Sequence, residues 1–375
     1  MSGAPPQAVC FTYWLSGHNT ARYAMLFPQL ASVVRVHKFV FDRRRVVSAI
    51  QWRAWRVAHR RLVYPVALRV LQRRYRALFT LDPWQVPHWK GSVIVDVCDP
   101  WYNEIALLNL PQVQAIVVTN ETARETYRAL GVNKPIFIIP CGVPLETDTH
   151  RVQRVRAEFR ADGDIVVGYH APTLTLSRDG RRRFRQGMDD LDFLCAAVED
   201  ARRVEPRITL WLVGRASASV NAYAAARPWV KVIGYVPLAE LLDYVACFDI
   251  GVYPRTGTLP PGRLSYKMAQ YMARRVPIVS TAVAESFLVR EAACGIICDS
   301  QPAFSEALVR LMRSPAEAAR FGMAGRAYAE HHFDWARLIP YYEQIIRDAL
   351  ASQAGVPAGG PPHSSEARAI AQSRH

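Results

Sequence analysis

Short apolar runs separated by amphipathic stretches are the main pattern along this chain of 375 residues. An apolar run of about four to eight residues bounded by Gly, Pro, Asn or Asp is typical of a buried strand, whereas a longer stretch with apolar positions three and four apart is typical of a helix. The strands expected on this pattern are Val9–Leu15, Val33–Phe41, Ser92–Val97, Gln114–Thr119, Lys134–Pro140, Asp164–Tyr169, Ile208–Gly214, Val230–Ile233, Phe248–Tyr253 and Ile278–Ser280. Because helices are expected between them, the pattern predicts α/β structure with parallel sheets.

The chain is long enough for two domains of ordinary size. We expect the first over residues 1–150 and the second over residues 151–332, and the polar, basic run THRVQRVRAEFRADG is expected to link their sheets. A last helix is expected over residues 333–350. Residues 351–375 are rich in Pro, Gly, Ser and Ala, and this composition predicts a disordered tail.

Composition narrows the class of protein. Half of the residues are apolar, but no apolar run approaches the roughly 18 residues that a membrane-spanning helix needs. The start of the chain lacks the pattern of a signal peptide, and the seven cysteines are scattered, with only Cys294 and Cys298 close in sequence. We therefore expect reduced thiols in a cytoplasmic protein. The net charge of +15 predicts anionic partners, which include nucleotides, anionic lipid and nucleic acid.

Residues 43–81 are unusual because they contain eleven arginines and no Asp or Glu. Helical spacing places Val47, Trp55 and Leu62 on one face and Arg45 and Arg53 on roughly the opposite one, so basic amphipathic helices are expected over residues 43–79. One interpretation is contact between Arg43–Arg76 and an anionic membrane surface. The alternatives are a solvated helix packed on its own domain and nucleic-acid binding, which is not expected because no recognised binding module is present.

The most informative stretch is Pro254–Thr281, which follows an apolar strand. A loop rich in Gly and Pro precedes Ser265, a plausible N-cap for a helix that carries Lys267 in its first turn and Gln270 further on. A strand, a glycine-rich loop and a helix N-terminus together can hold a phosphate group, because free backbone N–H groups and the helix dipole face the anion. The alternative is an ordinary connection capped by a serine.

The run SYKMAQYMA from Ser265 to Ala273, followed by VPIV, resembles the donor-binding segment of family 4 glycosyltransferases. That family often shows Ser-Pro-x-Lys-x-x-Glu-Tyr-Met-Ala. Here Gln270 occupies the position of the Glu that binds the donor's ribose hydroxyls, and Gly262 occupies that of the first Glu of the longer motif. The resemblance implies the GT-B architecture, which consists of two Rossmann-like domains with parallel sheets facing a central cleft and a C-terminal helix that crosses back to the first domain.

Two candidate site residues lie after strands of the first domain. Gly17 follows the first strand in a Ser-Gly-His-Asn turn, where it could let a donor or acceptor approach the backbone, although a plain tight turn fits equally well. Asp99 follows Ser92–Val97 after one intervening residue, Cys98, at the strand end where ligands of open α/β sheets bind. Related enzymes often carry His or Asp there, but an Asp before Pro100 is also a common turn former.

The remaining candidates lie in the second domain. The loop after Asp164–Tyr169 sits where the family binds the donor diphosphate, so Arg178 and Arg183 are candidate phosphate ligands, together with the two arginines between them. Arg215 directly follows the strand Ile208–Gly214. Tyr235 lies where family members commonly recognise the nucleobase.

The resemblance implies sugar transfer from a nucleoside diphosphate sugar, UDP- or GDP-linked, to an acceptor hydroxyl, with retention of configuration and no metal or other cofactor. Asp99, Arg215 and Lys267 are the candidate catalytic residues, and Gln270 would hold the ribose. The acceptor is left open among lipid-linked intermediates, glycans and small molecules, and the expected location is cytoplasmic or peripheral on the cytoplasmic face of a membrane. The alternatives are a non-catalytic basic membrane-surface protein on a degenerate GT-B fold and a GT-B sugar-nucleotide epimerase.

Overall fold

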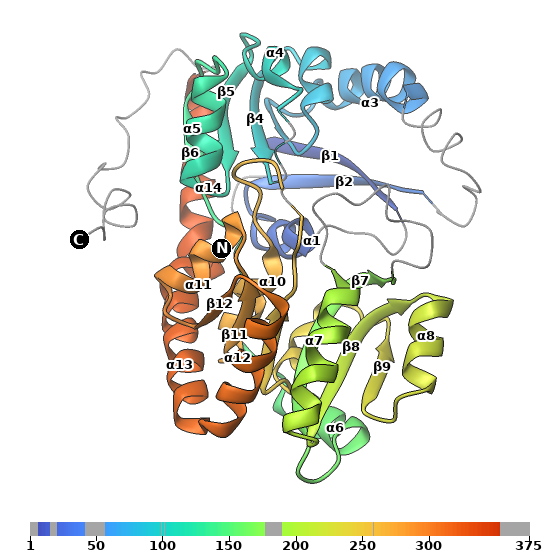
Figure 1. Cartoon of the computed structure of the whole chain (residues 1–375). Coiled ribbons are helices and arrows are strands. Elements are labelled where there is room, and N and C mark those ends of the chain that lie inside the picture. Colours follow the sequence, from blue (N-terminus) through green and yellow to red (C-terminus); the bar gives the residue numbers. More distant parts are fainter. Residues whose placement is uncertain are drawn as a thin grey trace. The chain divides into compact units, whose positions relative to one another are not determined.

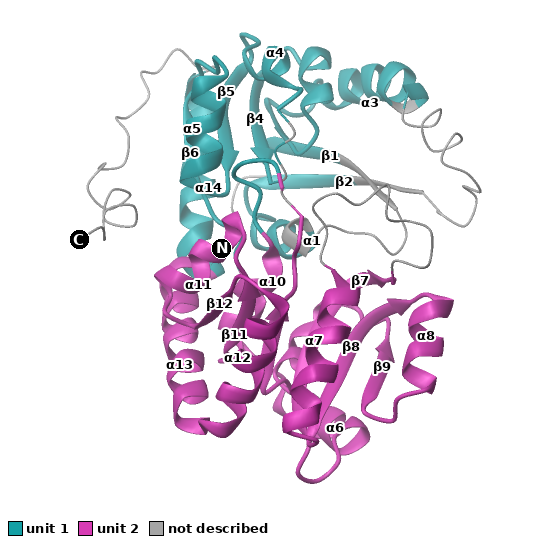
Figure 2. Cartoon of the chain, in the orientation of Figure 1, with its two compact units in different colours: residues 1–142, 260–264, 335–375 teal, residues 143–259, 265–334 magenta. Residues whose placement is uncertain are grey.

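The computed structural model describes residues 7–15, 21–41, 57–98, 100, 102–176, 190–257 and 259–352 (Figure 1). The chain divides into two compact units, shown in different colours in Figure 2. Unit 1 comprises Met1–Gly142, Pro260–Leu264 and Trp335–His375, and unit 2 comprises Val143–Leu259 and Ser265–Asp334. Each unit contains a six-stranded sheet whose paired strands are parallel, so the parallel α/β prediction is confirmed.

The sheet of unit 1 has the strand order β2-β1-β3-β4-β5-β6. Its strands are β1 (Ala8–Leu15), β2 (Val34–Phe41), β3 (Ala77–Thr80), β4 (Ser92–Val97), β5 (Val113–Val118) and β6 (Ile136–Ile138). Every residue of β3 and β4 is buried, as expected for central strands covered on both faces.

The helices of unit 1 are α1 (Ala21–Gln29), the π-helical turn η2 (His59–Val63), α3 (Tyr64–Leu71), the 3₁₀ turn η3 (Pro83–His88), α4 (Ile105–Leu108), α5 (Glu121–Ala129) and α14 (Trp335–Ala351). The expectation of basic helices over residues 43–79 needs correction, because α3 ends at Leu71 and Ala77–Thr80 form a strand. The apolar run ALFT pairs with β1 and β4 in the middle of the sheet, and that burial outweighs any helical continuation from the arginine-rich segment.

The C-terminal helix α14 belongs to unit 1, as the sequence predicted. Its apolar face, which includes Trp335, Leu338 and Ile346, joins the same buried cluster as Phe79 and Ile94 of the sheet. The hydroxyl of Tyr342 donates a hydrogen bond of 2.7 Å to the buried carboxylate of Asp96 in β4. Burial raises the pKa of the neighbouring Cys10 thiol far above its usual range, and the Asp96 charge adds to this effect.

The sheet of unit 2 has the strand order β12-β11-β10-β7-β8-β9. Its strands are β7 (Ile165–Leu174), β8 (Ile208–Ala216), β9 (Val230–Gly234), β10 (Ile250–Tyr253), β11 (Ile278–Thr281) and β12 (Gly295–Cys298). Its helices are α6 (Thr149–Phe159), α7 (Leu191–Val204), α8 (Ala218–Ala225), α9 (Leu238–Val245), α10 (Tyr266–Ala273), the 3₁₀ turn η6 (Ala284–Ser286), α11 (Phe287–Glu291), α12 (Gln301–Arg313) and α13 (Pro315–His332).

The run interpreted as a linker is helix α6 instead. The side chain of Asp148 caps it by accepting a hydrogen bond of 3.0 Å from the backbone nitrogen of Arg151, and that bond lowers the pKa of Asp148. Arg151 also pairs with Asp243 at 2.9 Å, and Val155 is buried against the unit. Only one residue of α6 is buried, so the sequence lacks the repeated apolar positions that would predict an amphipathic helix.

Two features are absent from the described part of the chain. None of its helices is long and apolar enough to cross a membrane. No group of three or more His, Cys, Asp or Glu side chains within the described ranges is arranged to hold a metal ion.

Candidate functional site

Polar and aromatic side chains gather at the carboxyl ends of the strands of unit 2, the edge where open parallel sheets bind ligands. The exposed Arg215 is the last residue but one of β8, and Tyr169 and the buried His170 precede it from the middle of the neighbouring strand β7. Helix α10 begins close to this edge, after the loop that follows β10 (Figure 1). The edge therefore combines cationic groups, a helix N-terminus and aromatic rings.

Helix α10 is capped as the sequence predicted. The hydroxyl of Ser265 accepts a hydrogen bond of 3.4 Å from the backbone nitrogen of Lys267, in the first turn. The ammonium group of Lys267 lies 5.4 Å from the centroid of the Tyr169 ring in β7. This cation–π contact places the lysine beside the middle of β7, close to the first turn of α10, where its charge and the helix dipole can act on the same ligand.

Gln270 is buried on the same helix, with an exposed fraction of only 2%. Its side-chain nitrogen makes no hydrogen bond to any described residue. A buried amide donor without a protein partner is rare in folded proteins and is a marker of a site that a ligand or a water completes. The hydroxyl-binding role of Gln270 stays a prediction.

Tyr271 holds the helix against the sheet. Its hydroxyl donates a hydrogen bond of 3.2 Å to the carbonyl oxygen of Val252, and its ring lies 5.4 Å from the His170 ring in an edge-to-face contact. The ring can approach because residue 251 is glycine, where a Cβ atom would lie only 2.7 Å from it. Packing against strand β10 therefore determines the orientation of α10 and of Gln270 and Lys267 on it.

Arg215 and Tyr235 lie side by side at the ends of β8 and β9. The guanidinium carbon of Arg215 is 4.6 Å from the centroid of the Tyr235 ring, and half of the tyrosine is exposed. Gly214, at φ +149°, precedes the arginine, and a Cβ atom there would lie 1.9 Å from the carbonyl oxygen of Ala171. Only glycine allows β8 to pass β7 this closely, so Gly214 determines where Arg215 leaves the sheet.

Sequence reasoning missed a buried ionic cluster at the end of β10. Arg255 donates a hydrogen bond of 2.7 Å to the Tyr253 hydroxyl, and its Nε atom lies 3.6 Å from a carboxylate oxygen of Glu285. The backbone nitrogen of Arg255 also donates to the Thr281 hydroxyl at 2.9 Å. The available signal was an arginine two residues after a buried strand, similar to the signal that singled out Arg215.

Gly262 lies in the short segment Pro260–Leu264, which belongs to unit 1, whereas the chain before and after this segment belongs to unit 2. Its carbonyl oxygen accepts a hydrogen bond of 2.6 Å from the Asn120 side chain at the start of α5. Its φ is +73°, and a Cβ atom there would lie 2.5 Å from the Cα of Ala123. The position that carries Glu in the family motif therefore has no room for a side chain here.

Four predicted site residues, Gly17, Asp99, Arg178 and Arg183, lie outside the described residues. The residue before Asp99 is described, and it shows a contact that the sequence did not suggest. The Sγ atom of Cys98, after β4, lies 3.7 Å from that of Cys141, after β6, although 43 residues separate them. Both thiols are half-buried, whereas the other five cysteines are buried.

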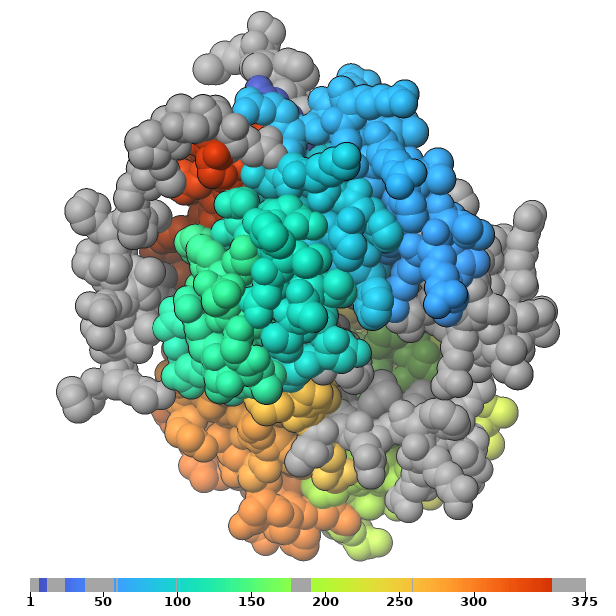
Figure 3. Space-filling model, turned by 90° about the horizontal axis from the view of Figure 1, so that it is seen from above, coloured from blue at the N-terminus to red at the C-terminus, as the bar shows by residue number. Residues whose placement is uncertain are grey.

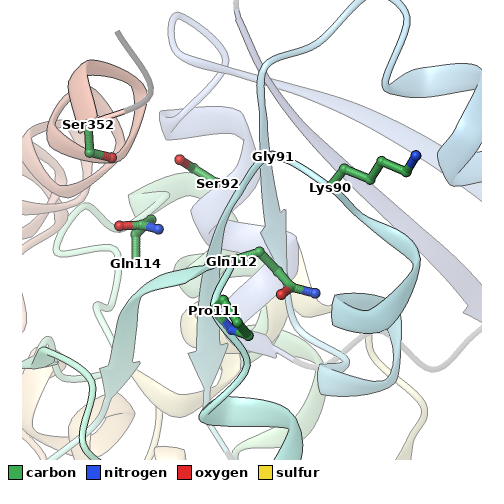
Figure 4. Close-up of a pocket in the computed structure, with 7 residues that line it drawn as sticks. All are labelled: Lys90, Gly91, Ser92, Pro111, Gln112, Gln114 and Ser352. Atoms are coloured by element: carbon green, nitrogen blue, oxygen red, sulfur yellow. The ribbon is translucent and has the colours of Figure 1, made fainter. Parts of the chain in front are cut away.

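A separate pocket lies in unit 1, at the amino-terminal ends of strands β4 and β5 (Figure 4). It is lined by Lys90, Gly91, Ser92, Pro111, Gln112, Gln114 and Ser352. None of the predicted site residues contributes to it, and ligands of parallel sheets bind at the carboxyl ends of the strands. This pocket is therefore not the candidate site.

Comparison with known proteins agrees with this arrangement. Residues 181–314 match the family described as Glycosyl transferases group 1. A stretch of 226 residues is 24% identical to the GDP-mannose-dependent monoacylated alpha-(1-6)-phosphatidylinositol monomannoside mannosyltransferase of Corynebacterium glutamicum. That match spans 58% of this chain and 58% of the relative.

Solved structures show the same fold across nearly the whole chain. The Anabaena protein HepE in complex with UDP superimposes with a TM-score of 0.61 at 12% identity, and the match covers 91% of this chain and 99% of that chain. The sucrose-phosphate synthase of Thermosynechococcus elongatus gives a TM-score of 0.62 at 16% identity, with coverage of 92% and 100%.

The chain thus has the two-domain GT-B fold, as predicted. Residues 181–314 match the group 1 glycosyltransferases, so the resemblance found in the sequence is confirmed over this part of the chain.

Proposed function

We propose that the protein transfers a sugar from a nucleoside diphosphate sugar to an acceptor hydroxyl. The observation that carries this proposal is helix α10. Lys267 lies in its first turn, and the buried Gln270 on the same helix has a side-chain nitrogen without a hydrogen-bond partner among the described residues. A nucleoside diphosphate matches this pair, because it offers phosphate oxygens to the cation and ribose hydroxyls to the amide.

The chemistry requires stabilisation of the diphosphate as it leaves with growing negative charge. Fixed cations and backbone N–H groups at a helix N-terminus can supply this without a metal ion. We assign this work to Lys267 and Arg215, assisted by Arg178 or Arg183. Asp99 would lie near the acceptor or the transferred sugar. Retention of configuration is proposed from the resemblance to family 4, and nucleotide binding that persists in EDTA would support metal independence.

The donor is proposed to be UDP- or GDP-linked. The name of the Corynebacterium relative specifies GDP-mannose, and HepE has been solved with UDP-glucose. Tyr235, with its exposed ring beside Arg215, would stack on the base. A lipid-linked acceptor is favoured over a free glycan or a small molecule, because the acceptor in the relative's name is a phosphatidylinositol mannoside.

The test is calorimetric titration of the purified protein with UDP, GDP, TDP and ADP. We expect micromolar binding of UDP or GDP and a loss of at least about tenfold in affinity for Lys267→Ala, because a charge-assisted phosphate contact is removed. Lys90→Ala is the matched control, since Lys90 is an exposed lysine beside the pocket on unit 1. Equal binding by wild type and Lys267→Ala would overturn the assignment of the site.

Turnover separates the alternatives. The first of the two motif glutamates is replaced by Gly262, where a side chain has no room, and this observation favours a non-catalytic protein on this fold. Incubation with radiolabelled donor sugars, with and without a lipid extract, is expected to yield labelled product and free nucleoside diphosphate. Conversion of the donor sugar alone would indicate an epimerase. Nucleotide binding without any turnover of the donor sugars would indicate the non-catalytic form.

A further inference from the structure

Exposed apolar side chains gather on one segment of unit 1. Ten large apolar side chains among the described residues are exposed, and half of them lie between residues 57 and 84. These five, which we call the apolar patch, are Val57, Leu62, Val66, Val70 and Trp84. Exposed fractions of 68%, 64% and 58% for Leu62, Val66 and Val70 exceed those of most exposed apolar residues elsewhere. Such clustering marks an interaction surface, because exposed apolar residues are normally scattered singly.

The opposite face of the segment explains why the patch faces outward. Tyr64 and Leu68 of α3 are fully buried, and the Tyr64 hydroxyl donates a hydrogen bond of 2.8 Å to Asp82. The Tyr64 ring also packs edge-to-face on Phe11 of β1, with 6.1 Å between centroids. Since Leu62, Val66 and Val70 recur every four residues, they share the side of the helix away from these anchors. Packing within unit 1 therefore explains why Tyr64 and Leu68 are apolar, but it does not explain why the exposed positions of the helix are apolar.

The segment that carries the patch is rich in cations. Residues 57–81 contain six arginines and no Asp or Glu, and Arg61, Arg69 and Arg73 are exposed. Arg60 stacks over the Trp84 ring, 4.6 Å from its centroid, and lies 3.8 Å from Asp82. Helix α3 lies at the outside of unit 1 in Figure 1, and the blue segment that carries it forms part of the outer surface in Figure 3. Exposed aliphatic side chains and arginines thus alternate along this segment, and an arginine-tryptophan stack adjoins it in unit 1.

We propose that the apolar patch binds the surface of a lipid bilayer rich in anionic lipids. The aliphatic side chains and Trp84 would enter the boundary between headgroups and acyl chains, and the arginines would contact the headgroup phosphates. A second copy of the chain is disfavoured because two such surfaces would bring arginines against arginines. A nucleic acid offers phosphates but no apolar volume for Leu62, Val66 and Val70. The proposal does not rest on the proposed sugar transfer.

The test is co-sedimentation of the full chain with vesicles of phosphatidylcholine containing about 30% phosphatidylglycerol, against vesicles of phosphatidylcholine alone. The first variant combines L62Q, V66Q and V70Q, which keeps every charge. Its control combines L130Q, V204Q and M323Q, three exposed apolar residues elsewhere. The second variant combines R61Q, R69Q and R73Q, and its control combines R128Q, R203Q and R313Q, which are also exposed arginines.

Wild type is expected to bind the anionic vesicles and not the neutral ones. Each patch variant should bind at least about tenfold more weakly, while each control binds like wild type. Circular dichroism of all variants would show that they remain folded. Absence of vesicle binding by wild type would overturn the proposal, as would an equal loss of vesicle binding in a patch variant and its control. It would also be overturned if wild type were a dimer in light scattering and only the L62Q, V66Q, V70Q variant were a monomer. Binding to duplex DNA that survives this variant while vesicle binding is absent would point to nucleic acid instead.

Discussion

The guanidinium group of Arg215 lies 4.6 Å from the centre of the Tyr235 ring, although the two residues end different strands, β8 and β9. The sequence singled them out for different roles, the arginine for the diphosphate and the tyrosine for the base. Their contact means that one ligand can touch both, and that the tyrosine ring restricts the rotamers of the arginine.

We expect Tyr235→Ala to weaken binding of the preferred nucleoside diphosphate by about tenfold, because stacking of a base on an aromatic ring is lost. Tyr235→Phe keeps the ring and should bind nearly as tightly as wild type. Calorimetric titration measures both. Wild-type affinity in Tyr235→Ala would remove the tyrosine from the site.

Gln270→Leu is expected to move stability and binding in opposite directions. Leucine has a similar volume and leaves no buried donor without a partner, so the free energy of unfolding of the unliganded protein should rise by about 1 kcal/mol. Nucleotide affinity should fall by about tenfold, because the ribose hydroxyls lose their amide partner.

Urea denaturation and calorimetry measure the two effects of Gln270→Leu. Gln270→Glu, the family residue, is the companion variant and should retain binding. A Gln270→Leu protein that binds nucleotide like wild type would show that the buried amide serves some other purpose.

Gly262→Ala should destabilise unit 1 by about 1–3 kcal/mol, because the left-handed backbone at φ +73° and the close approach to Ala123 both exclude a side chain. The matched control is Gly131→Ala, where φ is +88° but no atom lies within 4 Å of the added Cβ, so only backbone strain of about 1 kcal/mol is expected. Urea midpoints of the two variants measure the difference. Equal midpoints would show that the loop from Pro260 to Leu264 shifts to accommodate the added methyl group at little cost in stability.

Cys98 and Cys141 are expected to form a disulfide under mild peroxide treatment. Their sulfur atoms are 3.7 Å apart, so a shift of less than about 2 Å reaches bonding distance. One hydrogen peroxide takes two hydrogens from the two thiols and leaves as two water molecules. Burial raises the pKa of Cys195 and Cys294 to about 12 and that of Cys298 to about 11, so these thiols stay protonated and inert at neutral pH.

Peptide mass spectrometry without reductant identifies the bridge, and Cys141→Ser is the control. Oxidation that is the same in wild type and Cys141→Ser, with no bridged peptide, would contradict the prediction.

The strands were predictable because a buried parallel strand is a continuous apolar run whatever it pairs with. Ser92–Val97 was predicted with the bounds that β4 has, whereas β3 was missed because it follows an arginine-rich helix almost without punctuation. Helix α6 was missed because its exposed charges hide a single buried valine. Both failures lie where the local pattern competes with a tertiary contact.

The sequence by itself determined the features that depend on near neighbours. Examples are the helix caps at Ser265 and Asn120 and the glycine-rich connection into α10. Each depends on residues only a few positions apart, so the amino-acid sequence is enough to predict it.

Only the tertiary structure decided which distant residues meet. Arg215 reached Tyr235, Cys98 reached Cys141, and Gly262 closed on Ala123 with no space for the glutamate of the family motif. These contacts depend on the strand order, on close approach of the backbone at glycines and on side-chain volumes. These are properties of the packed fold, and they produce no periodic pattern in the sequence.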